Sequence, residues 1–241
     1  MTGLKSRIIT AVILAVLIIA SFFTPNIFAF RILFGFFGVM ALIEMFISDN
    51  YSTNQDQANE SRLVMIEMMF IMLGTVAVAF FLDAIEIILV LVASVANDIA
   101  AYFVGSIFHD RLFKKRPFPN VSPKKSWEGI IGGYIGAVLV EILVVFIFTK
   151  CFGKTDDWVY IDKIILFIFI SPIAAIFGDW VESFTKRFLG IKDSGEIIIM
   201  RNIPILGKLE LFMKSHGGFA DRIDSWTTVA CLMFLIKLSS P

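Results

Sequence analysis

The chain has 241 residues, of which 58% are hydrophobic and only 17% are charged. Soluble domains are about half apolar and about a quarter charged, so this composition argues against a water-soluble enzyme, a disordered protein and a nucleic-acid binder. Lys plus Arg and Asp plus Glu number 21 each, so net charge favours no partner. The two cysteines, Cys151 and Cys231, are too few and too distant for a disulfide framework or a metal site. The composition predicts a polytopic membrane protein.

Seven apolar stretches reach or approach the roughly 20 residues that a membrane-spanning helix needs. In chain order they cover about 8–23, 27–47, 63–82, 84–108, 129–149, 163–181 and 226–238. The first is interpreted as an uncleaved anchor, because no small-x-small cleavage site follows it. We expect an all-α membrane helical bundle of about seven transmembrane helices. Residues 1–241 are expected to form a single integral-membrane domain, with motif-free spans over 1–82 and a catalytic part over 83–241.

The basic residues predict the orientation of the chain. The segments 1–7, 48–62, 109–128 and 182–225 hold 16 of the 21 Lys and Arg residues. Basic loops stay on the cytoplasmic side of a membrane. The two richest segments, 109–128 and 182–225, therefore share the cytoplasmic face, where we expect them to form the site. The segment 48–62 is expected to be a solvated polar loop.

Charged side chains within the apolar stretches are costly in lipid, so each is a functional hypothesis. Asp98 lies deep in its span beside Asn97, and helical spacing places it on one face with Tyr102 and Gly105. The alternative for Asp98 is a structural, hydrogen-bonded carboxylate inside the bundle. The other such residues are Arg31, Glu44, Glu67, Glu86, Glu141 and Asp179.

Asp179 is followed by polar residues at helical spacing. Ser183 and the pair Lys186 and Arg187 share its face as the predicted helix leaves the membrane. Snorkelling cations at a helix end are the simpler explanation for the last two. Together these residues place an acid at membrane depth, with a hydroxyl and two cations above it.

A second acidic pair, Asp221 and Asp224, lies just before the last apolar stretch. Its members are three residues apart and so share a helical face. Paired carboxylates suit a hard divalent ion such as Mg²⁺, which keeps waters and bridges to phosphates. The preceding Gly217 and Gly218 leave backbone N–H groups uncovered near a helix start, which favours an anion. A solvated charged loop is the alternative, but the combination indicates a metal–phosphate site.

The other basic segment leads directly into the fifth apolar stretch through Val121-Ser122-Pro123-Lys124-Lys125-Ser126-Trp127-Glu128-Gly129. Two lysines and two hydroxyls at a helix entrance can hold phosphate. Trp127 is at interfacial depth, where an indole is favourable without any function. The glycines that follow are interpreted as close helix packing rather than ligand contacts; they are Gly129, Gly132, Gly133 and Gly136.

These segments resemble a known family. The signature of phosphatidate cytidylyltransferases, also called CDP-diacylglycerol synthases, is closely similar to three segments, Ser183-Phe184-Thr185-Lys186-Arg187, Lys192-Asp193-Ser194-Gly195 and His216-Gly217-Gly218-Phe219-Ala220-Asp221-Arg222-Ile223-Asp224. Asn97–Gly105 and Val121–Gly129 look like two further blocks in the expected order. The resemblance covers about 95–237. The chain departs from the family in the twenty residues 196–215, where members have a short connection, and at Ile99, where members have a small hydroxyl residue.

The resemblance implies that CTP and phosphatidic acid react to give CDP-diacylglycerol and pyrophosphate, a step of phospholipid biosynthesis. It implies Mg²⁺ at two divalent metal positions, and it leaves a monovalent cation open. The expected metal ligands are Asp221, Asp224, Asp193 and Asp179. The expected catalytic residues are Asp193, Asp221, Asp224, Lys186, Arg187 and Lys192. The expected substrate-binding residues are Ser122, Lys124, Ser183, Arg222, His216 and Asp98, with His216 shaping the turn rather than acting as a base.

Several alternatives stay open at this point. One is a related membrane CTP-dependent nucleotidyltransferase that acts on another lipid phosphate; another is an inactive homologue. A transporter is a different class, but the chain shows no repeat and no paired broken helices. The expected partners are CTP, phosphatidic acid and the lipid bilayer, without nucleic acid, and a homodimer is left open. The expected location is a membrane, which is the plasma (inner) membrane if the host is a prokaryote, with the active site facing the cytoplasm.

Overall fold

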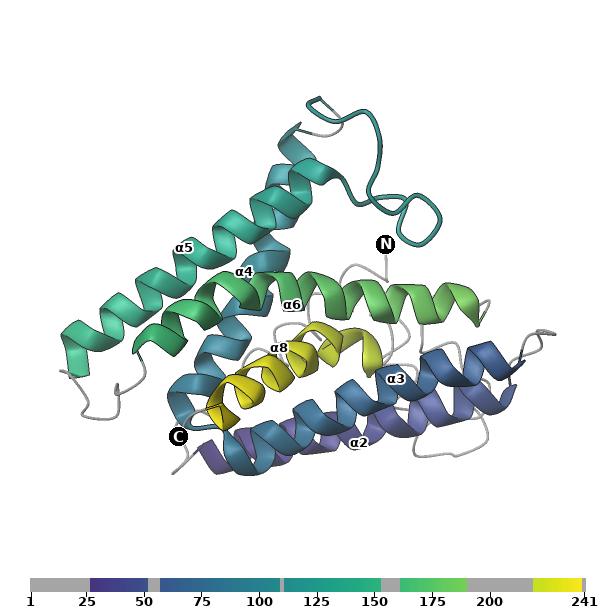
Figure 1. Cartoon of the computed structure of the whole chain (residues 1–241), viewed down its shortest axis with the longest axis horizontal. Helices are drawn as coiled ribbons and strands as arrows, with labels where there is room; N and C mark the ends of the chain where they lie inside the picture. Colours follow the sequence, from purple (N-terminus) through teal and green to yellow (C-terminus); the bar gives the residue numbers. More distant parts are fainter. Residues whose placement is uncertain (1–26, 52–56, 109–110, 153–160, 190–218, 240–241) are drawn as a thin grey trace, which may run out of the picture. The chain divides into compact units, whose positions relative to one another are not determined.

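A computed structural model describes residues 27–51, 57–108, 111–152, 161–189 and 219–239 (Figure 1). These ranges contain six α-helices and one π-helical turn and no strand, as the all-α prediction requires. The elements are α2 (Phe28–Tyr51), α3 (Gln57–Val76), η2 (Ala77–Phe81), α4 (Ala84–Phe108), α5 (Trp127–Phe152), α6 (Ile161–Phe188) and α8 (Ala220–Leu238).

Within these ranges, five helical segments are long and apolar enough to cross a membrane: Phe28–Ile47, Arg62–Phe81, Ala84–Phe108, Trp127–Cys151 and Asp162–Phe188. They correspond to the second to sixth predicted spans and indicate a multi-pass membrane protein. The first predicted span, 8–23, lies outside the described residues. The seventh, 226–238, lies in α8, which is not among the five, so the predicted number of seven is not confirmed.

The prediction of a solvated loop over 48–62 is wrong at both ends. Helix α2 continues to Tyr51, and α3 begins at Gln57. A helix satisfies its own backbone hydrogen bonds, so polar residues can extend it beyond the apolar segment without leaving unpaired groups.

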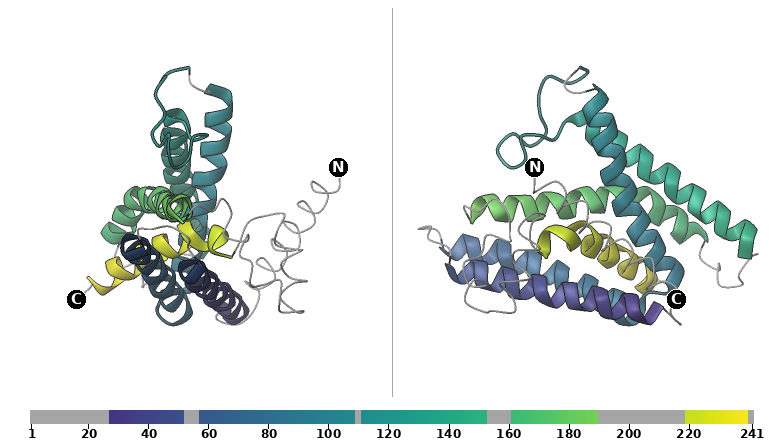
Figure 2. Two further views of the ribbon diagram at one scale, coloured as in Figure 1. Left: turned by 90° about the vertical axis from the view of Figure 1, so that its right-hand side faces the viewer. Right: turned by 180° about the vertical axis from the view of Figure 1, so that it is seen from behind.

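The chain divides into two compact units, one within 1–84 and 184–224 and the other within 85–183 and 225–241, here called unit 1 and unit 2. In unit 1, α2 and α3 lie side by side (Figures 1 and 2). They bury a shared apolar core made of Met40, Ala41, Met45, Val64, Ile71, Leu189, Phe219, Ala220 and Ile223. The core thus joins α2 and α3 to Leu189, the residue after α6, and to the start of α8.

Arg31 on α2 explains how a charged residue is accommodated in a span. Its guanidinium donates to the carbonyl of Ala79 at 2.9 Å and to that of Leu82 at 2.8 Å, where η2 ends. Carbonyl groups at a helix end have no intrahelical donor, and lipid offers none. Arg31 therefore caps the break between α3 and α4.

In unit 2, α4 and α5 pack closely along a row of glycines. A Cβ atom built at Gly132 would lie 2.4 Å from Cβ of Val104, and one at Gly136 would lie 2.3 Å from Cβ of Ala100. Such contacts are far below ordinary van der Waals distance, so only glycine permits this approach. The predicted role of the glycines in helix packing is confirmed.

Helices α5 and α6 are joined by a buried polar contact. The Ser171 hydroxyl lies 3.0 and 2.9 Å from the two carboxylate oxygens of Glu141, and both residues are fully buried. Large apolar side chains elsewhere on α5 are exposed, among them Leu139 and Phe146. An apolar exterior over a polar contact in the interior is expected of helices surrounded by lipid.

Candidate active site

Several residues of the segments Asn97–Gly105 and Val121–Gly129 line one pocket in unit 2. This pocket has a volume of about 410 Å³ and lies where α4, the start of α5 and α6 meet. Asp98, Tyr102 and Gly105 all line it, as their predicted common face requires. Lys124, Lys125 and Asp179 contribute the other charged groups. Asp98 therefore lines a pocket that also contains charged groups of the basic loop and of α6.

An ion pair joins the basic loop to α6 at this pocket. The Lys125 ammonium contacts Oδ2 of Asp179, and the two side chains are 28% and 33% exposed. The Ser183 hydroxyl lies 3.5 Å from the other carboxylate oxygen of Asp179, one turn further along α6. A predicted metal ligand, Asp179, and a predicted substrate-binding residue, Ser183, are therefore neighbours, and a lysine neutralises the carboxylate.

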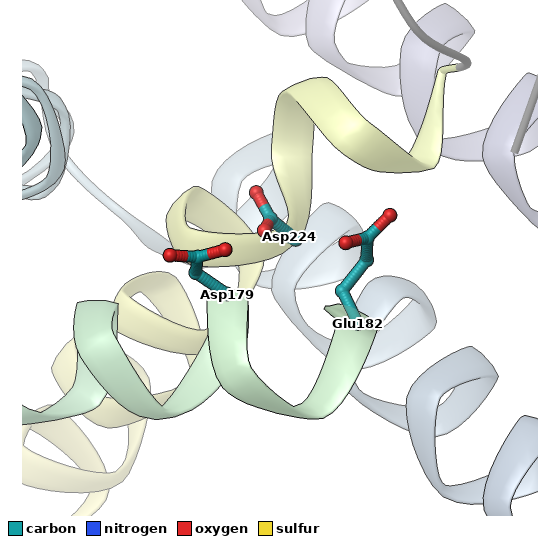
Figure 3. A group of neighbouring side chains, drawn as sticks. All are labelled: Asp179, Glu182 and Asp224. Atoms are coloured by element: carbon teal, nitrogen blue, oxygen red, sulfur yellow. The ribbon is translucent and has the colours of Figure 1, made fainter. Parts of the chain in front are cut away.

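Glu182 also belongs to this part of α6. It lies three residues after Asp179 and is 2% exposed. Figure 3 shows the carboxyl groups of Asp179 and Glu182 on the same side of α6. The sequence prediction did not include Glu182, although its spacing from Asp179 would have indicated it.

The loop between α4 and α5 is held by the first turn of α5. Oε1 of Glu128 accepts the backbone N–H groups of Leu112 and Phe113, each at 2.9 Å. Ser126 precedes α5, and its hydroxyl accepts the N–H of Gly129 at 3.1 Å, as a helix N-cap does. The segment Ser126-Trp127-Glu128-Gly129 thus starts α5 and fixes the loop that carries the lysines.

The second predicted cluster lies in unit 1. Nζ of Lys186, in the last turn of α6, lies 2.7 Å from Oδ1 of Asp221, in the first turn of α8, and the two side chains are 13% and 12% exposed. A part-buried, hydrogen-bonded ion pair of this kind is costly to break from one side only. Asp224 follows one turn later on α8 (Figure 3). It is half-buried, whereas Arg187 is exposed. Lys186 and Asp221, predicted from separate motif segments, are in direct contact.

The remaining predicted residues are placed as follows. Lys192, Asp193 and His216 lie outside the described residues, as does the side chain of Arg222. Ser122 is half-buried in the loop before α5, where its N–H donates to the carbonyl of Phe118 at 2.9 Å. It is not among the described residues that line the pocket, whereas Lys124 is, with an exposed side chain.

Comparison with known proteins agrees with these motifs. The model of the cytidylyltransferase family matches residues 49–239, which is more than three-quarters of the chain. The chain belongs to the cytidylyltransferase family. Similar proteins include phosphatidate cytidylyltransferases from Helicobacter pylori (37% identical over 142 residues) and Mycobacterium tuberculosis (34% over 152 residues). Another is phosphatidate cytidylyltransferase 4, chloroplastic, from Arabidopsis thaliana, 31% identical over 147 residues.

These matches cover 59%, 63% and 60% of the chain. They cover 43%, 38% and 30% of the three relatives, so the chain spans less than half the length of the relatives that it matches. The family membership therefore rests on the family model, which matches residues 49–239.

Proposed function

We propose that the protein is a Mg²⁺-dependent phosphatidate cytidylyltransferase that converts CTP and phosphatidic acid into CDP-diacylglycerol and pyrophosphate. The observation that carries the proposal is the charged pocket of unit 2, in which Lys124, Lys125, Asp98 and Asp179 meet between membrane-spanning helices. A site for a two-tailed lipid and a water-soluble nucleotide needs charged groups at an apolar wall. The names of the family and of the relatives support the same reaction.

The reaction needs no protein nucleophile. A phosphate oxygen of phosphatidic acid attacks the α-phosphorus of CTP, and a new P–O bond forms. The bond between the α-phosphorus and the oxygen that bridges to the β-phosphorus breaks, and its electron pair leaves with pyrophosphate. Phosphoryl transfer of this kind depends on positioning and charge neutralisation. Lysines that bind the lipid phosphate and the phosphates of CTP would supply both positioning and charge neutralisation. Lys124 is the exposed lysine of the pocket.

The proposed metal ligands are Asp221 and Asp224 of unit 1, Asp179 of unit 2, and Asp193, a set that rests on the motif. Carboxylates are the hard oxygen donors that Mg²⁺ prefers, so the donor set fits the ion. Held by these carboxylates, Mg²⁺ would supply positive charge to offset the charge of the leaving pyrophosphate. In the structure Lys125 neutralises Asp179 and Lys186 neutralises Asp221. We propose that each lysine turns from its aspartate to a substrate phosphate when substrates bind.

The proposed location is the cytoplasmic face of a membrane, which is the plasma (inner) membrane if the host is a prokaryote. The basis is the concentration of Lys and Arg in the segments 109–128 and 182–225, because the translocation of basic segments across a membrane is disfavoured. The lipid bilayer supplies phosphatidic acid at that face.

The test is pyrophosphate release by the full chain purified in detergent. We expect release to require CTP, Mg²⁺ and phosphatidic acid together, and to be lost in Asp224→Asn. Asp162→Asn is the matched control, because Asp162 is an exposed acid in the first turn of α6, outside the motifs. Release with an isoprenoid phosphate but not with phosphatidic acid would assign another lipid substrate. No release with any acceptor, from folded protein, would contradict the proposal.

A further inference from the structure

The first turn of α8 begins without a capping residue of its own. Phe219 precedes Ala220, and neither side chain can accept a hydrogen bond from the first backbone N–H groups of the helix. Such groups need an acceptor, which Ser, Thr, Asp or Asn usually supplies from the position before the helix. The catalytic motif therefore starts a helix whose N-terminal donors must be satisfied from elsewhere in the chain.

Glu44 of α2 supplies that acceptor. Its Oε2 accepts the N–H of Ala220 at 2.9 Å, across 176 residues of sequence, and its side chain is 1% exposed. A carboxylate at a helix N-terminus also interacts favourably with the helix dipole. Asp221, the next residue after Ala220, is the one that Lys186 contacts.

Aromatic packing holds the same junction. The ring of Phe219 lies 6.1 Å from that of Phe36 and 5.5 Å from that of Phe37, both on α2, with edge-on geometry. Ala220 and Ile223 are buried in the core that α2 and α3 form. Helix α2 thus fixes both the position and the direction in which α8 begins.

We propose that Glu44, which lies in a helix without family motifs in the sequence, is a positioning residue for the catalytic Asp221. Glu44 fixes the first turn of α8, in which Asp221 lies. This inference rests on the proposed function for its catalytic consequence, whereas the anchoring of α8 by Glu44 can be measured without it.

The test uses Glu44→Leu, which keeps the volume but removes the acceptor, and Glu44→Gln, which keeps an oxygen acceptor but removes the charge. Glu141→Gln is the matched control, since Glu141 is an equally buried acid of unit 2 that contacts Ser171 instead. Three quantities are measured on the full chain in detergent. They are amide hydrogen exchange over 219–224, Mn²⁺ binding by electron paramagnetic resonance, and the Mg²⁺ concentration that gives half-maximal pyrophosphate release.

We expect Glu44→Leu to speed hydrogen exchange over 219–224 at least tenfold, to weaken Mn²⁺ binding, and to raise the half-activating Mg²⁺ concentration several-fold. Glu44→Gln should recover most of the exchange protection, and Glu141→Gln should change none of the three quantities.

Unchanged exchange in Glu44→Leu would overturn the anchoring of α8. Faster exchange with unchanged Mn²⁺ binding and Mg²⁺ activation would overturn the positioning role. If the unmodified protein released no pyrophosphate, the proposed function would fail, and exchange with Mn²⁺ binding would still decide the role of Glu44.

Discussion

The contact between α4 and α5 makes a strong prediction, because it depends on the absence of a single methyl group. In Gly136→Ala the new Cβ would lie 2.3 Å from Cβ of Ala100. Ordinary carbon–carbon contacts are about 3.5 to 4.0 Å, so the atoms must separate by about 1.2 Å or more. The Ala100 methyl has no rotamer by which to avoid the clash, so the helices themselves must move apart.

The magnitude follows from two opposing effects. Overpacking of this kind costs about 1 to 3 kcal/mol, whereas replacing glycine by alanine in a helix gains about 0.5 to 1 kcal/mol. We expect Gly136→Ala to lower the free energy of unfolding by about 0.5 to 2 kcal/mol. Gly35→Ala is the matched control, because a Cβ at Gly35 on α2 meets nothing within 4 Å and the substitution should be neutral or stabilising.

The assay is unfolding in mixed micelles, followed by circular dichroism, for both variants and for the double variant Gly136→Ala with Ala100→Gly. The second substitution removes the clashing methyl, so the double variant should be more stable than the sum of the two single effects predicts, by about 0.5 kcal/mol or more. Equal stability of Gly136→Ala and Gly35→Ala, or strict additivity in the double variant, would refute the reasoning.

Three further predictions concern the site. Lys125→Met should lower the free energy of unfolding by less than about 1 kcal/mol, because its contact with Asp179 is about a third exposed. A loss above about 2 kcal/mol in the same unfolding assay would contradict this, because only a buried ion pair costs that much to break. Glu128→Leu should speed hydrogen exchange at Leu112 and Phe113, which lose their shared acceptor, and unchanged exchange there would show that another group holds the loop. Removal of divalent ions with EDTA should abolish pyrophosphate release and added Mg²⁺ should restore it, whereas release that persists in EDTA would exclude an essential metal.

Much of the fold could be predicted because membrane spans follow from the length of apolar runs. The stretch 84–108 coincides with α4, since charged and polar residues border it on both sides. The end of α2 at Tyr51 and the beginning of α3 at Gln57 were not predicted. Hydropathy indicates where the apolar segment ends and not where the helix ends. The seventh span was expected in α8. Charged residues, among them Asp221 and Asp224, lie within the first five positions of that helix, so its apolar part is short.

The candidate site was predictable where its residues are near one another in sequence. The common face of Asp98, Tyr102 and Gly105 follows from helical spacing alone. The pairing of Lys125 with Asp179 links residues 54 positions apart, and that of Glu44 with Ala220 links residues 176 apart. No local pattern encodes such contacts, because they depend on how the helices pack.

The central claim is that the lipid phosphate attacks the α-phosphorus of CTP. The most direct measurement uses CTP that carries ³²P either at the α-phosphate or at the γ-phosphate. The full chain in detergent is incubated with this CTP, phosphatidic acid and Mg²⁺, and the product that carries the ³²P is identified. We expect the α-label to enter an organic-soluble product that yields labelled CMP on hydrolysis, and the γ-label to appear only in pyrophosphate. Transfer of the γ-label to lipid, or no lipid-soluble label from either nucleotide, would contradict the account.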